Sequence, residues 1–219
     1  MKNNVCFIGL GKLGLPLACV LASGNNNIFC LDKNEYILNL LNNGKIPFFE
    51  ANLKELMDSV EENIVCYTDS YRKAVAATDA AIVLVNTQLG DDGYSSDFVE
   101  SAVSDIAVNL KELEKDYYTI ILSSTVLPGT IKNKLIPLVE KISGRKCGVG
   151  FGFAYVPDFV KLGSVINDFK NPEFFLAGAA TERDFLTTEK IFEGVHENNC
   201  SHHRLTLEEA EVAKVALNA

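Results

Sequence analysis

Three glycines near the amino terminus have the spacing of a loop that holds phosphate groups. They lie in the run IGLGKLG at positions 8–14, which follows an apolar stretch and opens a helix-like one. In this G-x-G-x-x-G pattern the first glycine permits a tight turn, the second lets the backbone approach a pyrophosphate, and the third lets helix and strand pack closely. Backbone N–H groups and the helix dipole would hold the anion. We therefore predict a dinucleotide-binding loop made of Gly9, Leu10, Gly11, Lys12, Leu13 and Gly14.

A carboxylate, Asp32, ends the second apolar run of the chain. A carboxylate at this place accepts hydrogen bonds from the ribose hydroxyls and repels a 2′-phosphate, which favours NAD over NADP. Lys33 is a complication, because a neighbouring cation could tolerate that phosphate. The competing interpretation is a solvated Asp32 that only caps the next helix. We expect NAD as the cofactor.

Apolar, β-branched runs recur along the chain and alternate mostly with helix-like segments. Near-continuous apolar strands of this kind are typical of a parallel sheet covered by helices on both faces. The sequence therefore predicts an α/β fold of the Rossmann type, with a doubly wound, mainly parallel sheet. The expected strands are residues 5–8, 28–31, 64–67, 81–85, 119–122, 148–155 and 174–177.

Two helices bear on the organisation of the chain. Asp97 and Glu100 have the spacing of a capping box, and apolar residues from Phe98 to Leu113 keep helical spacing behind them. A second helical pattern runs from Thr206 to the last residue without a glycine or proline stop signal. We expect an NAD-binding domain over residues 1–205 and, over 206–219, the start of a central connecting helix of a longer protein. The alternative is a natural end that frays.

Composition narrows the class of protein. The formal net charge is −9, which makes non-specific binding of nucleic acid or an anionic membrane unfavourable. No run of 18 apolar residues is present, and Lys12 interrupts the stretch that resembles a signal peptide. The six cysteines form no C-x-x-C pair and His202 and His203 are adjacent, so we expect no metal site. Unpaired cysteines in apolar runs favour the cytoplasm.

Further segments match one family pattern in order. Residues 44–53 (GKIPFFEANL) resemble N-G-x-x-P-x-x-E-x-x-L, residues 85–87 (VNT) resemble V-x-T-P with Gln88 in place of proline, and residues 123–130 (SSTVLPGT) resemble S-T-V-x-x-G-T. Residues 157–172 (PDFVKLGSVINDFKNP) are similar to P-E-F-L-x-E-G-S-A-I-x-D-F-x-N-P. Glu211, Lys214 and Asn218 resemble A-E-x-x-K-x-x-x-N. Together they resemble the UDP-glucose/GDP-mannose dehydrogenase family over essentially the whole chain.

This resemblance implies an enzyme that oxidises the C6 alcohol of a nucleotide sugar twice, with two molecules of NAD. It also implies a cysteine nucleophile in a later segment that this chain does not contain, so we expect the chain alone to be inactive. Cys6, Cys19 and Cys30 lie in expected core elements, and Cys66 has no neighbouring base. We expect Cys147 and Cys200 to precede strands, at the edge of the sheet opposite the ligands.

The resemblance assigns roles to matched residues. Lys214 and Asn218 are four apart on one helical face and would stabilise an oxyanion, Thr125 would orient a water, and Asp158 would be the acid/base group. Without the family match, Lys214 and Asn218 can be explained as an exposed polar face of a helix, and Thr125 as a cap of the following turn. Further cofactor contacts are expected from Val85, Asn86, Thr87, Ser124 and Thr125, and substrate contacts from Asp158, Phe159, Val160, Lys161, Lys214 and Asn218.

Departures from the family pattern keep alternatives open. Asp158 replaces a glutamate, Leu162 replaces a second glutamate, and Val156 replaces an asparagine. These changes motivate a non-catalytic nucleotide-binding or regulatory protein as one alternative. Another is a Rossmann dehydrogenase of the β-hydroxyacid type. The spacing after Pro157 favours a UDP-hexose such as UDP-glucose, and the resemblance implies that the full-length protein is a homodimer or a larger assembly.

Overall fold

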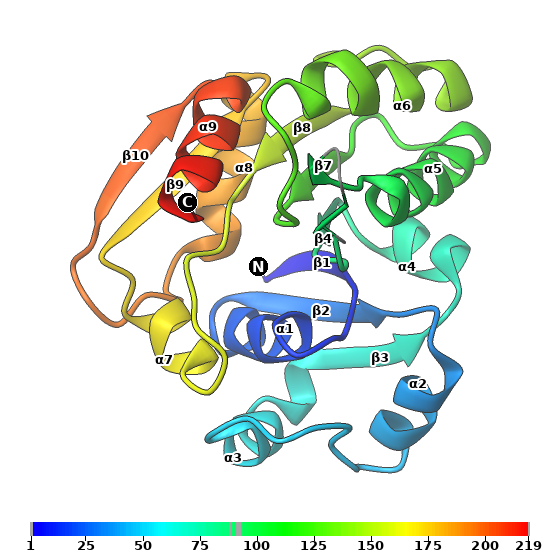
Figure 1. Cartoon of the computed structure of the whole chain (residues 1–219). Helices are drawn as coiled ribbons and strands as arrows, with labels where there is room; N and C mark the ends of the chain where they lie inside the picture. Colours follow the sequence, from blue (N-terminus) through cyan, green and yellow to red (C-terminus); the bar gives the residue numbers. More distant parts are fainter. Residues whose placement is uncertain (1, 88, 91–92, 219) are drawn as a thin grey trace.

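The computed structural model describes residues 2–87, 89, 90 and 93–218. Within them, one sheet of eight strands has the order β10-β9-β8-β7-β4-β1-β2-β3 (Figure 1). A short antiparallel pair, β5 (Leu89–Gly90) and β6 (Gly93–Tyr94), follows β4. The strands of the large sheet are β1 (Asn3–Ile8), β2 (Asn26–Leu31), β3 (Ile64–Thr68), β4 (Ala80–Val83), β7 (Thr119–Leu122), β8 (Gly152–Tyr155), β9 (Phe174–Ala179) and β10 (Ser201–Leu205).

Helices cover both faces of this sheet. One hydrophobic cluster joins the sheet to α1 and α8, and another joins it to α4, α5, α6 and α9. The predicted doubly wound α/β architecture is therefore confirmed. The helices are α1 (Gly14–Ser23), α2 (Glu35–Asn42), α3 (Leu53–Ser59), η1 (Glu61–Asn63), α4 (Tyr71–Ala77), α5 (Asp97–Glu112), η2 (Ile131–Leu135), α6 (Ile136–Ser143), α7 (Val165–Lys170), α8 (Glu182–Phe192) and α9 (Leu207–Asn218).

The strand order places a ligand crevice at one point. The chain runs from β1 outward to β2 and β3, and then returns to the other side of β1 as β4. Open α/β sheets bind ligands outside the carboxyl ends of the strands at such a reversal. The residues that follow β1 and β4 therefore face this crevice.

The last two strands reverse direction. β9 is antiparallel to β8, and β10 is parallel to β9, with Ser201 opposite Phe174. The start of β10 therefore lies at the edge where the parallel strands end, and Cys200 precedes it. The expectation that Cys200 lies at the opposite edge is wrong, because it assumed that every strand points the same way.

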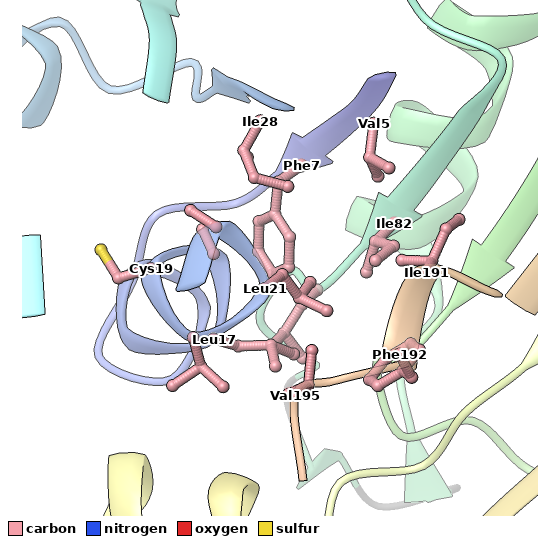
Figure 2. Packing of buried hydrophobic residues seen from close by; sticks show 14 of the residues in the cluster. Val5, Phe7, Leu17, Cys19, Leu21, Ile28, Ile82, Ile191, Phe192 and Val195 are labelled. Carbon is pink, nitrogen blue, oxygen red and sulfur yellow. The ribbon is translucent and has the colours of Figure 1, made fainter. Parts of the chain in front are cut away.

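The core explains why the amino-terminal elements are rigid. Phe7 of β1 and Leu21 of α1 are fully buried and meet Ile191 and Phe192 of α8 in one cluster (Figure 2). Burying a side chain of this size contributes about 1.5–3 kcal/mol. Since Phe7 stands just before the glycine loop, packing of the core fixes where that loop begins.

Helix α5 begins differently from the expectation. Its N-cap is Ser96, whose Oγ donates to Glu100 Oε1 at 2.7 Å, and Asp97 is the first helical residue. The buried face starts at Val99, while Phe98 is 53% exposed. Helical spacing alone did not distinguish the two adjacent starting points.

Helix α9 packs on the sheet as soon as it begins. A Cβ added at Gly178 of β9 would lie 2.8 Å from Ala210 Cβ, so the two elements are in close contact. The division of the chain at residue 205 stays a prediction. Among the described residues, no helix is long and apolar enough to cross a membrane.

Candidate functional site

The glycine loop has the geometry that a dinucleotide requires. Gly9 has φ of +100°, and a Cβ there would lie 2.1 Å from the Leu84 carbonyl oxygen. A Cβ at Gly14 would lie 1.9 Å from the Gly9 carbonyl oxygen, whereas nothing lies within 4 Å of one at Gly11. Gly9 and Gly14 therefore close the turn, and Gly11 leaves open space where a phosphate can approach the backbone.

The start of α1 suits an anion. The helix has no side-chain N-cap, and its first turn carries no carboxylate. Free N–H dipoles at such an end favour a negative ligand. Leu10 is buried in the core and Lys12 is exposed, so the predicted contribution of Leu10 is through its backbone.

Asp32 is held at the mouth of this loop. Its Oδ2 accepts from Leu10 N at 2.6 Å and its Oδ1 from Asn34 N at 2.8 Å. An ionised carboxylate has about four acceptor positions, so both oxygens keep room for ribose hydroxyls. The cap of α2 is Asn34, not Asp32, which removes the helix-cap interpretation.

The neighbouring cation is engaged elsewhere. Lys33 Nζ pairs with Asp105 Oδ2 at 2.6 Å and donates to Ser101 Oγ at 2.9 Å. Both partners lie on α5. These contacts give Lys33 a role within the fold, in fastening the segment after β2 to α5.

Ser124 joins two loops at the crevice. Its Oγ accepts from Val85 N at 2.8 Å and donates to Val85 O at 2.9 Å. The buried hydroxyl therefore positions the loop after β4, which carries the exposed Asn86 and the half-buried Thr87. Gln88, which replaces the family proline, lies outside the described residues.

A cavity of about 410 Å³ opens beside this crevice at the ends of β7 and β8. Four predicted substrate residues line it: Asp158, Phe159, Val160 and Lys161. Its wall also includes Ser123, whose buried Oγ has no hydrogen-bond partner among the described residues. Sequence reasoning missed Ser123, although it lies two residues before Thr125, which is half-buried just past β7.

The central pair of the site is Lys214 with Asp158. Lys214 Nζ lies 2.6 Å from Asp158 Oδ1 and also donates to the Asp158 carbonyl oxygen, and the two side chains are only 6% and 10% exposed. The ammonium lies 5.2 Å from the centre of the Phe159 ring. A buried ion pair next to a cavity is a source of both positive charge and a proton acceptor.

Glu211 sets the position of Lys214 on the helix. It is buried, and its carboxylate accepts from Gly129 N at 2.6 Å and Ile131 N at 2.9 Å. Burial raises the pKa of Glu211. The bonds fasten α9 to the loop after β7, so the same helix presents Lys214 to Asp158. The side chain of Asn218 lies outside what the structure describes.

Glu50 performs a similar task for the loop of Asp158. Its carboxylate is buried and accepts from Gly163 N at 3.1 Å and Val165 N at 3.0 Å. The segment that matches the family around residue 50 therefore holds the 157–165 loop. Leu162 on this loop is 65% exposed.

The cysteine thiols of the core are held protonated by burial. Burial raises the pKa of Cys19 to about 12 and raises those of Cys6 and Cys30 further. The pKa of Cys147 is raised to about 11, also by burial first. A thiol held protonated is a poor nucleophile.

Comparison with known proteins settles the family. A sequence model of the NAD-binding domain of the UDP-glucose/GDP-mannose dehydrogenase family matches residues 3–198. The chain belongs to this family. Its cofactor is accordingly NAD, and the glycine loop and Asp32 fit that cofactor.

Relatives include both kinds of enzyme in the family's name. The chain is 30% identical over 192 residues to GDP-mannose 6-dehydrogenase of Pseudomonas savastanoi pv. phaseolicola, covering 87% of this chain and 44% of that protein. It is 31% identical over 221 residues to UDP-glucose 6-dehydrogenase AglM of Haloferax volcanii, covering 99% and 50%. The chain therefore spans about half the length of the curated relatives it matches.

A solved structure gives the same result for the fold. The ternary complex of GDP-mannose dehydrogenase from Pseudomonas aeruginosa superposes with a TM-score of 0.91 at 29% identity, covering 98% of this chain and 49% of that one. The family assignment favours a nucleotide-sugar dehydrogenase over a dehydrogenase of the β-hydroxyacid type.

Proposed function

We propose that this chain is the NAD-binding half of an enzyme that oxidises the C6 alcohol of a nucleotide sugar to the acid. The observation that carries the proposal is the buried pair of Lys214 and Asp158 at a cavity beside the dinucleotide loop. Burying two charges costs desolvation energy, and a role in proton transfer gives a reason for keeping this pair beside the cavity.

The pair supplies two parts of an alcohol oxidation. Bound NAD would supply the hydride acceptor. Asp158 accepts the proton of the C6 hydroxyl, and the Lys214 ammonium stabilises the negative charge that develops on that oxygen. The resulting aldehyde would bond to a cysteine thiolate of the complete protein as a thiohemiacetal, and a second hydride transfer to NAD would leave a thioester. The Thr125 hydroxyl orients the water that hydrolyses this thioester, which releases the acid and the thiol. Its position just past β7 supports this role.

We propose a UDP-hexose of the UDP-glucose kind as substrate. The run Pro157-Asp158-Phe159 supports this choice. Among the relatives are a GDP-mannose and a UDP-glucose dehydrogenase, so the competing substrate is GDP-mannose. Phe159, Val160 and Lys161 line the cavity and would lie along the sugar nucleotide.

We also propose that the complete protein acts in the cytoplasm as a homodimer or larger assembly. All six cysteines are free, which suits a reducing compartment. Val212 and Leu217 of α9 are 52% and 60% exposed. Apolar side chains exposed on one helix suit burial against a second copy.

The test uses the complete native protein with NAD and either UDP-glucose or GDP-mannose, following NADH absorbance. We expect two NADH per molecule of UDP-glucose and slower turnover with GDP-mannose. Asp158→Asn should lower turnover by about 10²–10⁴-fold, the usual contribution of a positioned proton-transfer group. Unchanged turnover in this variant contradicts the role of Asp158, and no turnover of either sugar by the native protein contradicts the function.

A further inference from the structure

Three metal-binding side chains gather where α8 leads into β10. The ligand atoms of His196, Cys200 and His202 all lie within 4.8 Å of one another. The first two lie on the 193–200 connection, and the third lies on the edge strand β10. Sequence reasoning considered only the adjacent pair of histidines, and the third histidine joins through the fold.

One separation can be compared with a metal centre directly. Cys200 Sγ lies 3.6 Å from His196 Nδ1. Zinc binds thiolate at about 2.3 Å and imidazole at about 2.05 Å, and at the tetrahedral angle these two ligand atoms lie about 3.5 Å apart. The pair therefore already has the spacing of two ligands of one ion, and a ligand atom of His202 lies within 4.8 Å of both.

The surroundings favour metal binding over proton binding. Both imidazoles flank the buried ring of Phe175, at centroid distances of 5.3 Å for His196 and 4.9 Å for His202. Burial, with a smaller effect from His202, lowers the pKa of His196. Metal ions bind the neutral form of imidazole through its lone pair.

A carboxylate stands behind the exposed histidine. Glu189 Oε1 of α8 lies 3.6 Å from His202 Nδ1. When a histidine binds metal through its other nitrogen, a carboxylate at this place accepts the remaining N–H and fixes the ring. Glu189 can instead move to the ion as a fourth ligand.

We propose that His196, Cys200 and His202 bind one divalent ion of the zinc class, with the fourth position taken by water or Glu189. Two nitrogens and one sulfur are the donors that zinc prefers. Binding converts the Cys200 thiol to a thiolate and releases its proton to solvent. The evidence for this site does not rest on the proposed oxidation.

The ion would connect parts of the fold that the chain otherwise holds loosely. Four of the five residues of β10 are exposed, and its one neighbour in the sheet is β9. An ion shared by His202 and the 193–200 connection would fix the position of this edge strand. His196 also lines the cavity described above, so the ion would stiffen one cavity wall.

The test is a titration of the whole, reduced, chelator-treated chain with cobalt(II), which reports a bound thiolate through its charge-transfer absorption. We expect one cobalt per chain, displacement by zinc, and a zinc-dependent rise in Tm. Cys200→Ser should abolish the charge-transfer band, and His202→Ala should weaken binding at least tenfold. Glu189→Gln should weaken it about 10–100-fold if it orients His202.

Matched controls keep the test specific. His203→Ala removes the adjacent exposed histidine, which contacts Ser201 and Phe174 instead. Cys147→Ser removes another half-buried thiol. Both should bind cobalt as the native chain does. Absence of stoichiometric binding, or a thiolate band that survives Cys200→Ser, overturns the proposal; His202 is exposed, so its replacement tests the site without threatening the fold.

Discussion

Removing Asp158 should leave a buried, unpaired ammonium. Lys214 is 5% exposed, and its Nζ lies 2.6 Å from Asp158 Oδ1. Breaking a buried ion pair from one side typically costs about 3–5 kcal/mol, because the remaining charge loses its partner without regaining water. We expect Asp158→Ala to lower the free energy of unfolding by about 3 kcal/mol, the low end of this range. The Lys214 ammonium still contacts the backbone carbonyl of residue 158 and the Phe159 ring in this variant.

A double-mutant cycle measures the coupling itself. Lys214→Met alone should also destabilise the chain, because it strands the carboxylate of Asp158. The double variant should lose less stability than the two single variants together, by at least about 1.5 kcal/mol. This coupling is within the range for residues in contact. In a domain of this size, about 3 kcal/mol corresponds to a fall in Tm of roughly 6–12 °C.

Urea unfolding of the whole chain, followed by circular dichroism, provides the assay. Lys161→Met is the matched control, because Lys161 lies on the same loop but is exposed. It should change the free energy of unfolding by less than about 0.5 kcal/mol. Additive effects of the two site variants, or an Asp158→Ala variant as stable as the control, would refute the coupling.

Three other outcomes follow from the structure. Gly14→Ala should lower Tm strongly, because its Cβ would lie 1.9 Å from the Gly9 carbonyl oxygen. Gly11→Ala should leave Tm unchanged and weaken NAD binding. Equal Tm values for the two variants would contradict the loop geometry. Burial raises the pKa of Asp184, so the folded chain binds this proton more tightly than the unfolded chain, and stability falls as pH rises through the window above about 3.9. In urea titrations at stepped pH, the native chain should therefore lose stability relative to Asp184→Asn as the pH rises through that window. A difference in free energy of unfolding between the two chains that does not vary with pH would contradict the raised pKa of Asp184. At pH 8 a thiol reagent should label at most three cysteines of the folded chain quickly and all six after unfolding, because three thiols are buried; rapid reaction of a fourth in the folded chain would contradict their burial.

The sequence predicted most of the sheet because its strands are apolar throughout. Every residue of β4, β7 and β8 is buried, and β1 and β9 each have four consecutive buried residues. The direction of β10 was not predictable in this way. Four of its five residues are exposed, so no apolar run marks the strand. Its direction follows that of β9, whose antiparallel pairing with β8 is not encoded in a local pattern.

The residues of the candidate site were predicted from motifs, and their partners in the fold were not. The spacing of glycines 9, 11 and 14 and the place of Asp32 follow from local geometry, which a short segment encodes. The pairing of Lys214 with Asp158 joins residues 56 positions apart. Such contacts depend on how α9 crosses the sheet, and a linear pattern does not contain that crossing.

Calorimetric titration of the whole chain with NAD and, separately, with NADP tests the central assignment most directly. Loss of a hydrogen-bonded charged contact costs about 1.5–3 kcal/mol, so the native chain should bind one NAD at least tenfold more tightly than NADP. Asp32→Ala should weaken NAD at least tenfold and remove most of this preference. Equal affinity for both cofactors in the native chain, or a preference for NADP, would contradict the account of Asp32, and no binding of either would contradict the dinucleotide site itself.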